Sequence, residues 1–204
     1  MSETQKTIQN YLDLVKDTIV KLDSVQLEKA IEAFMRVHQG GHTLYVMGNG
    51  GSAATATHIA GDMVKGASFG LEKRFRVISL TDNMTAIMAI ANDVSYDDIF
   101  VEQLKNFIQP DDLVLGISGS GNSKNIVKSI ELAKSKGVQT IAFSGFKGGK
   151  ISELADIVIH ANVMDMEVAE DIHMIAFHTI KKEVMRRLMA KNPSMGGVYD
   201  ERVK

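Results

Sequence analysis

Two sets of histidine and acidic residues have spacings that place side chains on one face of a helix. His58 and Asp62 are four residues apart, and the segment AEDIHMIAFH carries Glu170, Asp171 and His178. Residues four apart on a helix are neighbours on its surface. Imidazole nitrogens and carboxylate oxygens transfer protons near neutral pH and bind zinc or other divalent transition metals. Because the chain has no cysteine, the two sets predict a His/carboxylate centre if their helices meet.

Helical spacing leaves two acids as partners of His178. Asp171 precedes His178 by seven residues, or two turns, and shares its face closely. Glu170 precedes His178 by eight residues and therefore lies roughly 80° away around the helix. Spacing alone favours Asp171. For both sets, an ordinary solvated helix face is the alternative interpretation.

Two loops rich in small residues follow apolar runs and precede helical patterns. Residues 48–52 read GNGGS and residues 118–123 read SGSGNS. Small residues let backbone amides approach an anion, hydroxyl groups add donors, and a helix N-terminus adds partial positive charge. Each loop alone also fits a tight turn with a helix cap. Together, at the ends of two expected strands, they predict a site for a phosphate-bearing ligand.

The first loop also matches a dinucleotide-binding pattern. Residues 48–53 fit G-x-G-x-x-A, a fingerprint that requires an acid at the end of the next strand. The next apolar run ends at Thr81 and Asp82, so an NAD(P)-dependent oxidoreductase is an open alternative. Against it, the chain has little room for a separate substrate domain, and the hydroxyl groups of the second loop suit a monophosphate.

The elements that must position these residues alternate along the chain. Apolar spacing predicts one or two helices over residues 4–38 and a final helix from about 165 to 190. Five short apolar runs, at 42–48, 74–80, 112–118, 138–143 and 156–161, predict strands. Near-continuous apolar strands separated by helices indicate a parallel sheet covered on both faces. We expect one doubly wound α/β domain, with N-terminal helices over 1–40, an α/β core over 41–190 and a C-terminal tail over 191–204.

The composition is that of a soluble globular protein. Of 204 residues, 45% are hydrophobic and 24% are charged, with a formal net charge of -2. Such a charge creates no global field that attracts nucleic acid or an anionic membrane. The first residues are polar and acidic, unlike a secretory signal, and no apolar run reaches transmembrane length. We therefore expect a cytoplasmic protein with no nucleic-acid or membrane partner.

Four segments together resemble the SIS (sugar isomerase) domain family and, within it, the sedoheptulose 7-phosphate isomerases, or phosphoheptose isomerases. They are GNGGSAATATHIAGDM, LTDNMTAIMAIANDVSYDDIF, GISGSGNSKNIVKSIELAKSKG and EDIHMIAFHTI, and the resemblance covers about residues 41–185. It implies a flavodoxin-like fold and an aldose–ketose isomerase that converts sedoheptulose 7-phosphate to D-glycero-D-manno-heptose 7-phosphate through an enediolate. It further implies a homotetramer with active sites between subunits.

The resemblance also implies roles for individual residues. His58 and His178 are implied as ligands of Zn²⁺, or of another divalent transition metal, and as acid–base groups. Asp62 is implied as a ligand and as the base, and Glu170 completes the ligand set. The implied substrate-binding residues are Asn49, Ser52, Asp82, Ser118, Ser120, Asn122 and Ser123, and we add Gly50 and Gly51 as members of the first glycine-rich loop.

The chain departs from the family pattern at four positions. Asp62 and Glu170 stand where the family usually has Glu and Gln, Gly119 where it often has Thr, and Gly66 where it has Arg. The shorter Asp62 carboxylate sits about 1 Å further back, a displacement that can cost roughly 10²-fold in rate. Because Asp and Glu both bind metals, we interpret these changes as a retuned site. A regulatory SIS protein that binds a sugar phosphate without turnover, and an isomerase of another sugar phosphate, are the alternatives.

Overall fold

The computed structural model describes residues 1–189 and contains a five-stranded parallel sheet. The strands are β1 (Thr43–Gly48), β2 (Arg76–Ser79), β3 (Leu113–Ser118), β4 (Gln139–Ser144) and β5 (Ile157–His160). Their order is β2-β1-β3-β4-β5, and every neighbouring pair is parallel. This order is that of the flavodoxin-like doubly wound sheets. The predicted fold class is therefore confirmed. The expected C-terminal tail lies outside the described residues.

Strand β1 shows why the apolar runs are nearly continuous. All six of its residues are buried. Leu44 and Val46 pack into the core on one face of the sheet, whereas Tyr45 and Met47 pack into the core on the other. Successive side chains of a strand point to opposite faces, so a strand covered on both faces needs apolar residues throughout.

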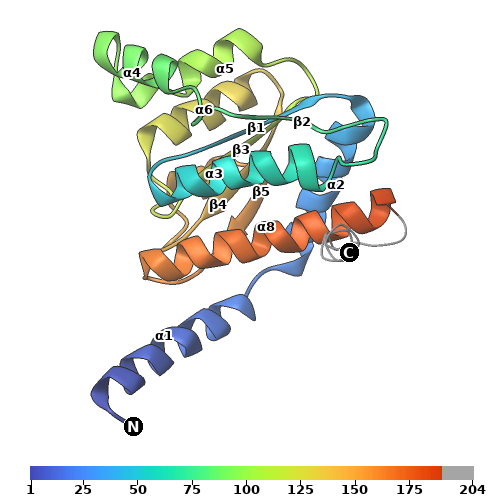
Figure 1. Ribbon diagram of the computed structural model, residues 1–204. Coiled ribbons are helices and arrows are strands. Elements are labelled where there is room, and N and C mark those ends of the chain that lie inside the picture. Colours follow the sequence, from blue (N-terminus) through green and yellow to red (C-terminus); the bar gives the residue numbers. More distant parts are fainter. Residues whose placement is uncertain (190–204) are drawn as a thin grey trace.

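Helices α2 (Ser24–Gly40), α3 (Gly51–Gly61) and α8 (Met166–Met189) cover one face of the sheet (Figure 1). Ile59 of α3 and Phe177 of α8 are fully buried in the same core cluster. This shared packing brings α3 and α8 side by side, although more than 100 residues separate them in sequence. No helix within residues 1–189 is long and apolar enough to cross a bilayer.

Helices α5 (Val101–Phe107), α6 (Lys124–Ser135) and α7 (Gly149–Leu154) cover the opposite face. Between β2 and α5 lie α4 (Met84–Asp93) and the 3₁₀ turn η2 (Tyr96–Asp98). None of the ten residues of α4 is buried in the isolated chain, although the helix is largely apolar.

The N-terminal helix α1 (Glu3–Ile19) projects from the body and contacts the chain through α8 (Figure 1). It begins with a capping box, in which the side chains of Ser2 and Gln5 each accept a hydrogen bond from the other residue's backbone N–H. Two helices thus occupy the region where one or two were expected. Ile8 and Leu12 of α1 remain more than half exposed, at 56% and 55%.

Candidate active site

His58, Asp62 and His178 meet between α3 and α8, and we refer to these three residues as the imidazole–carboxylate centre. His58 Nε2 lies 3.1 Å from His178 Nε2 and 3.2 Å from Asp62 Oδ2. His178 Nε2 lies 3.6 Å from the same carboxylate oxygen. One nitrogen or oxygen atom from each residue lies within 4.8 Å of the other two. The structure thus brings together three of the four implied metal ligands.

The backbone at Asp62 changes helix type. Helix α3 ends at Gly61, and a π-helical turn, η1 (Asp62–Gly66), follows it. The Asp62 N–H still donates to the His58 carbonyl, so the two side chains keep the four-residue spacing that the sequence suggested. In the π turn, the Ala67 N–H donates to the Asp62 carbonyl over 3.0 Å. Single π-helical turns are rare and are frequent at functional sites.

A lysine that the sequence analysis did not identify also reaches the centre. Lys181 Nζ lies 2.5 Å from Asp62 Oδ2, and the lysine side chain is only 15% exposed. Lys181 follows His178 by three residues on α8 and therefore shares its helix face. That spacing was the available signal in the sequence. Gly66 leaves room for the lysine, since a Cβ atom at this position would lie 3.0 Å from both Cε and Nζ.

The surroundings of His178 favour its neutral form. Burial lowers the pKa of His178, and the neighbouring His58 lowers it further. Asp62 opposes this shift, whereas Lys181 adds to it. A neutral imidazole keeps a lone pair on one ring nitrogen, which both a metal ligand and a general base require. The centre therefore presents His178 in the form that either role needs at neutral pH.

A cavity of about 270 Å³ opens at the carboxyl ends of β1 and β3, where ligands bind in doubly wound sheets. Both predicted loops contribute to it. Its lining consists of Asn49, Gly50, Gly51, Ser52, Ile117, Ser118, Gly119, Ser120, Ser123, Met166 and Glu170. The structure thus gathers most of the expected substrate-binding residues around one cavity, which we refer to as the serine cavity.

The loop geometry of the serine cavity favours an anion site over simple helix caps. Ser118 Oγ lies 3.0 Å from Ser123 Oγ and 3.4 Å from Ser120 Oγ, so three hydroxyl groups cluster. Ser123 is the N-cap residue of α6, yet its side chain makes no capping hydrogen bond. Gly50, the N-cap residue of α3, has no side chain to cap with. Both helix starts are therefore suited to accept an anion in place of a cap.

Two predicted residues, Asp82 and Asn122, do not line the cavity. Asp82 Oδ1 accepts a hydrogen bond of 2.5 Å from Thr57 Oγ1, which places this acid next to the residue preceding His58. Asn122 Nδ2 donates to the Ser120 carbonyl, and Asn122 Oδ1 accepts from the Lys150 N–H. Asn122 therefore stabilises the loop of residues 118–123.

Helix α8 reaches the serine cavity through two close contacts with glycines. A Cβ atom at Gly51 would overlap the carboxylate of Glu170, and a Cβ atom at Gly119 would overlap Sδ of Met166. With the α8 side chains in these positions, only glycine fits at either position. Met166 was not predicted, because nothing in the sequence pairs it with a loop some fifty residues away. The Glu170 carboxylate thus lies against the glycine loop and outside the three-residue centre.

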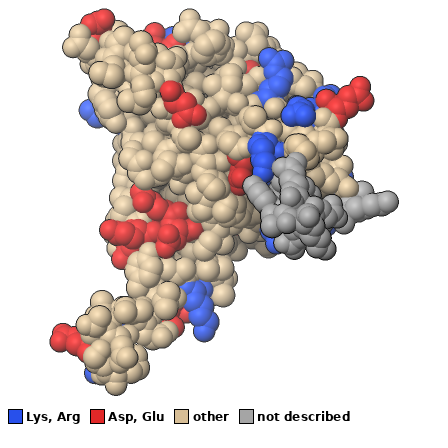
Figure 2. All heavy atoms as spheres, viewed as in Figure 1, with Lys and Arg blue, Asp and Glu red and all other residues tan. Residues whose placement is uncertain are grey.

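Acidic side chains gather over the N-terminal part of α8 (Figure 2). Burial raises the pKa of Glu170, and the nearby Glu167 and Asp171 raise it further. Asp171, which helical spacing favoured as the partner of His178, instead accepts a 2.6 Å hydrogen bond from Tyr11 on α1. This contact raises the pKa of the Tyr11 phenol to about 12. Asp171 therefore anchors the projecting helix.

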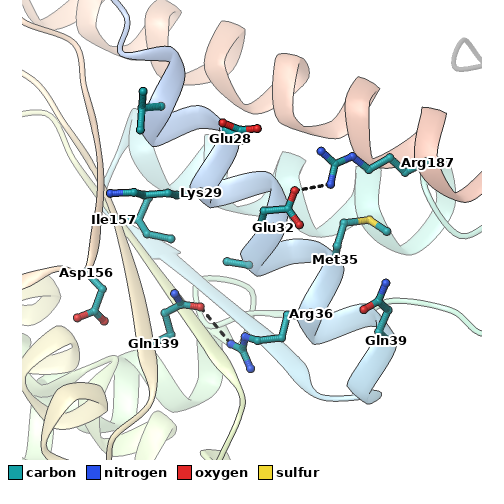
Figure 3. A pocket seen from close by; sticks show the side chains of 12 residues that line it. Glu28, Lys29, Glu32, Met35, Arg36, Gln39, Gln139, Asp156, Ile157 and Arg187 are labelled. Carbon is teal, nitrogen blue, oxygen red and sulfur yellow. Dashed lines mark hydrogen bonds and ion pairs between the residues drawn. The ribbon is translucent and has the colours of Figure 1, made fainter.

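A larger hollow of about 940 Å³ lies away from this edge, over α2 and the starts of β4 and β5 (Figure 3). Several of its charged groups are engaged in ion pairs or hydrogen bonds. Glu32 pairs with Arg187 over 2.5 Å, and Arg36 donates to the Asp111 carbonyl and to the Gln139 side chain. It contains none of the predicted site residues and lies at the amino ends of the strands, so we assign the candidate active site to the serine cavity and the centre.

Comparison with known proteins gives consistent matches. The sequence profile of the SIS domain matches residues 8–145. A phosphoheptose isomerase from Crocosphaera subtropica is 36% identical over 166 residues, 81% of this chain and 84% of the relative. One from Citrifermentans bemidjiense is 37% identical over 169 residues, covering 82% and 87%. The structure of phosphoheptose isomerase from Neisseria gonorrhoeae shares the fold, with a TM-score of 0.82, 24% identity and coverage of 90% and 98%.

Proposed function

This chain belongs to the SIS domain family and to its phosphoheptose isomerases, and from that premise we propose that it interconverts the ketose and aldose forms of a sugar phosphate. The substrate is sedoheptulose 7-phosphate and the product D-glycero-D-manno-heptose 7-phosphate. The observation that carries the proposal is that α3 joins two unlike sites. Gly51 at its start lines the serine cavity, and His58, about 10 Å further along the helix axis, belongs to the imidazole–carboxylate centre. This separation suits the two ends of one extended sugar phosphate.

The serine cavity holds the phosphate group in this proposal. Ser52, Ser118, Ser120 and Ser123 donate hydrogen bonds to it, and the starts of α3 and α6 contribute partial positive charge. Asn49, Gly50 and Gly51 complete the phosphate-binding end. Asp82 positions the sugar, and Asn122 stabilises the loop of residues 118–123. Binding energy from the phosphate end orients the reacting carbons at the other end.

Isomerisation moves a proton between C1 and C2 of the open-chain sugar through an enediolate. Asp62 is the proposed base that takes the proton from carbon. His178, neutral because of its lowered pKa, exchanges a proton with the sugar oxygen. Asp62 Oδ2 and His178 Nε2 are 3.6 Å apart, so the carboxylate can act on a carbon atom and the imidazole on an oxygen atom of the same enediolate.

The centre has the donor types of a zinc site. Two imidazole nitrogens and one carboxylate oxygen lie close enough to share an ion, and catalytic zinc sites use three such ligands with an open position. His58, Asp62 and His178 would hold it. Glu170 is proposed as a fourth ligand from the family resemblance alone, because its carboxylate lies against Gly51 in the structure. Bound Zn²⁺, or another divalent transition metal, would polarise the sugar carbonyl and stabilise the negative charge of the enediolate.

The proposed assembly is a cytoplasmic homotetramer with active sites at subunit interfaces and no nucleic-acid or membrane partner. Its support is the apolar surface that the single chain leaves exposed on α1 and α4. Ile8, Leu12, Met84 and Met88 are each more than half exposed, and apolar surface of this kind is typical of protein contacts. Light scattering of the purified protein tests the assembly, and a monomeric mass would contradict it.

The direct test of the proposed activity is NMR of purified protein with sedoheptulose 7-phosphate, with and without added Zn²⁺. We expect signals of the aldoheptose phosphate to appear and to depend on the metal. No conversion with zinc bound would reject this substrate, and a panel of other sugar phosphates would then separate an isomerase of different specificity from a regulatory protein that binds without turnover.

A further inference from the structure

Lys181 places a positive charge inside the imidazole–carboxylate centre. Its Nζ lies 2.5 Å from Asp62 Oδ2, the same oxygen that lies 3.2 Å from His58 Nε2 and 3.6 Å from His178 Nε2. Among the ion pairs of residues 1–189, Lys181 is the least exposed basic partner, at 15%. The charge is therefore held close to the carboxylate and is less screened by water than that of a surface pair.

The packing around Lys181 leads its ammonium group to Asp62. Helix α8 places Lys181 three residues after His178, so both side chains face α3. On the other side of the contact, Gly66 has no side chain. A Cβ atom at this position would lie only 3.0 Å from Cε and Nζ of Lys181, so the lysine occupies space that a larger residue would fill. The lysine, the glycine and the carboxylate thus form one packed unit.

An ammonium group and a divalent cation compete for the same carboxylate. An ion held by His58, Asp62 and His178 would share the Asp62 carboxylate with Lys181, and two neighbouring positive charges repel each other. Metal binding also uses the ligand oxygen directly, so any hydrogen bond to that oxygen must weaken or move. The ion pair therefore opposes metal binding at the centre.

We propose that Lys181 is a positioning residue that controls the metal affinity of the centre. Its ammonium group orients and neutralises Asp62 in the metal-free protein, and a divalent cation has to displace it. Occupancy by metal is therefore weaker than the three donors alone would give. The inference rests on the proposed metal site, but it concerns binding and requires no turnover.

The experiment is a calorimetric titration of metal-free, full-length protein with Zn²⁺ alone. Lys181→Met removes the charge and keeps most of the apolar stem, whereas Lys181→Arg keeps the charge. Lys182→Met makes the same change at the neighbouring, exposed position of α8 and is the matched control. We expect Lys181→Met to bind Zn²⁺ about tenfold more tightly than the wild type, and the other two variants to stay within about twofold.

Circular dichroism and thermal unfolding establish that each variant is folded. If Lys181→Met fails to fold, Lys181→Gln tests the same expectation with a polar side chain. Zinc affinity that is unchanged or weaker in the uncharged variant overturns the proposal. If no variant binds zinc, the proposal and the metal site both fail, whereas conversion of sedoheptulose 7-phosphate without zinc in the NMR assay would show that the isomerase assignment survives.

Discussion

Replacing His173 is expected to remove part of the acid sensitivity of this fold. The imidazole is fully buried on α8, and neither ring nitrogen has a side-chain hydrogen-bond partner in the described residues. It packs against Phe143 with ring centroids 5.7 Å apart. Burial lowers the pKa of His173 to about 4; the backbone of Ser144 raises it and His160 lowers it by smaller amounts. The folded protein therefore holds this histidine neutral.

The size of the effect follows from the two pKa values. The unfolded chain protonates His173 near 6.5, the folded protein only near 4, so the unfolded state binds more protons between these values. The contribution of neutral His173 to the free energy of unfolding is fully present above pH 6.5, and it is lost as the pH drops towards 4. The linkage relation gives a loss of about 2 kcal/mol between pH 7 and pH 5, and about 3 kcal/mol by pH 4.

Urea unfolding of the wild type and of His173→Leu at pH 7 and pH 5 measures this loss, at one fixed protein concentration because assembly also affects stability. We expect the free energy of unfolding of the wild type to fall by about 2 kcal/mol more than that of the variant. His42→Leu, which removes an imidazole that is not fully buried, is the control and should follow the wild type. Equal losses in the wild type and His173→Leu would refute the reasoning.

Three further predictions concern the site. His178→Gln should lower turnover by roughly 10²-fold or more without changing the circular dichroism spectrum, and a near-normal rate would remove this residue from the mechanism. Glu170→Gln should lower KM for the sugar phosphate roughly threefold, because it removes a negative charge from the lining of the serine cavity, where the negatively charged phosphate is expected to bind. The decrease in KM should grow as the pH rises above the raised pKa of Glu170. An unchanged KM would contradict this prediction. Asp62→Glu should lower kcat roughly tenfold or more, since the added methylene moves a carboxylate that Lys181 and both imidazoles hold in place; a faster enzyme would show that the centre is not adapted to Asp.

The strands were predictable because their burial is a property of each short run of sequence. A strand such as β3 is buried at all six positions, and only a continuous apolar run can satisfy that environment. The π-helical turn at Asp62–Gly66 was not predictable. It shifts hydrogen bonds by one residue in a segment whose composition also suits an α-helix, so nothing in the local sequence distinguishes the two.

The site was predictable only within single helices. The pairing of His58 with Asp62 follows from helical spacing, but their contact with His178 depends on α3 and α8 covering the same face of the sheet. Spacing also favoured Asp171 over Glu170, yet it reports only which residues share a helix face. It does not say which face meets α1, and Tyr11 of α1 binds Asp171.

Three glycines face three side chains of α8, and three of the departures from the family pattern belong to these pairs. Gly51 faces Glu170, Gly66 faces Lys181, and Gly119 faces Met166. Each glycine makes room for one α8 side chain, so neither member of a pair can change alone without overlap or an unfilled space. Gly66 and Gly119 are two of the departures, and Glu170 is a third. They are therefore halves of tertiary contacts, and restoring the family's residue at either glycine would require the facing α8 side chain to move.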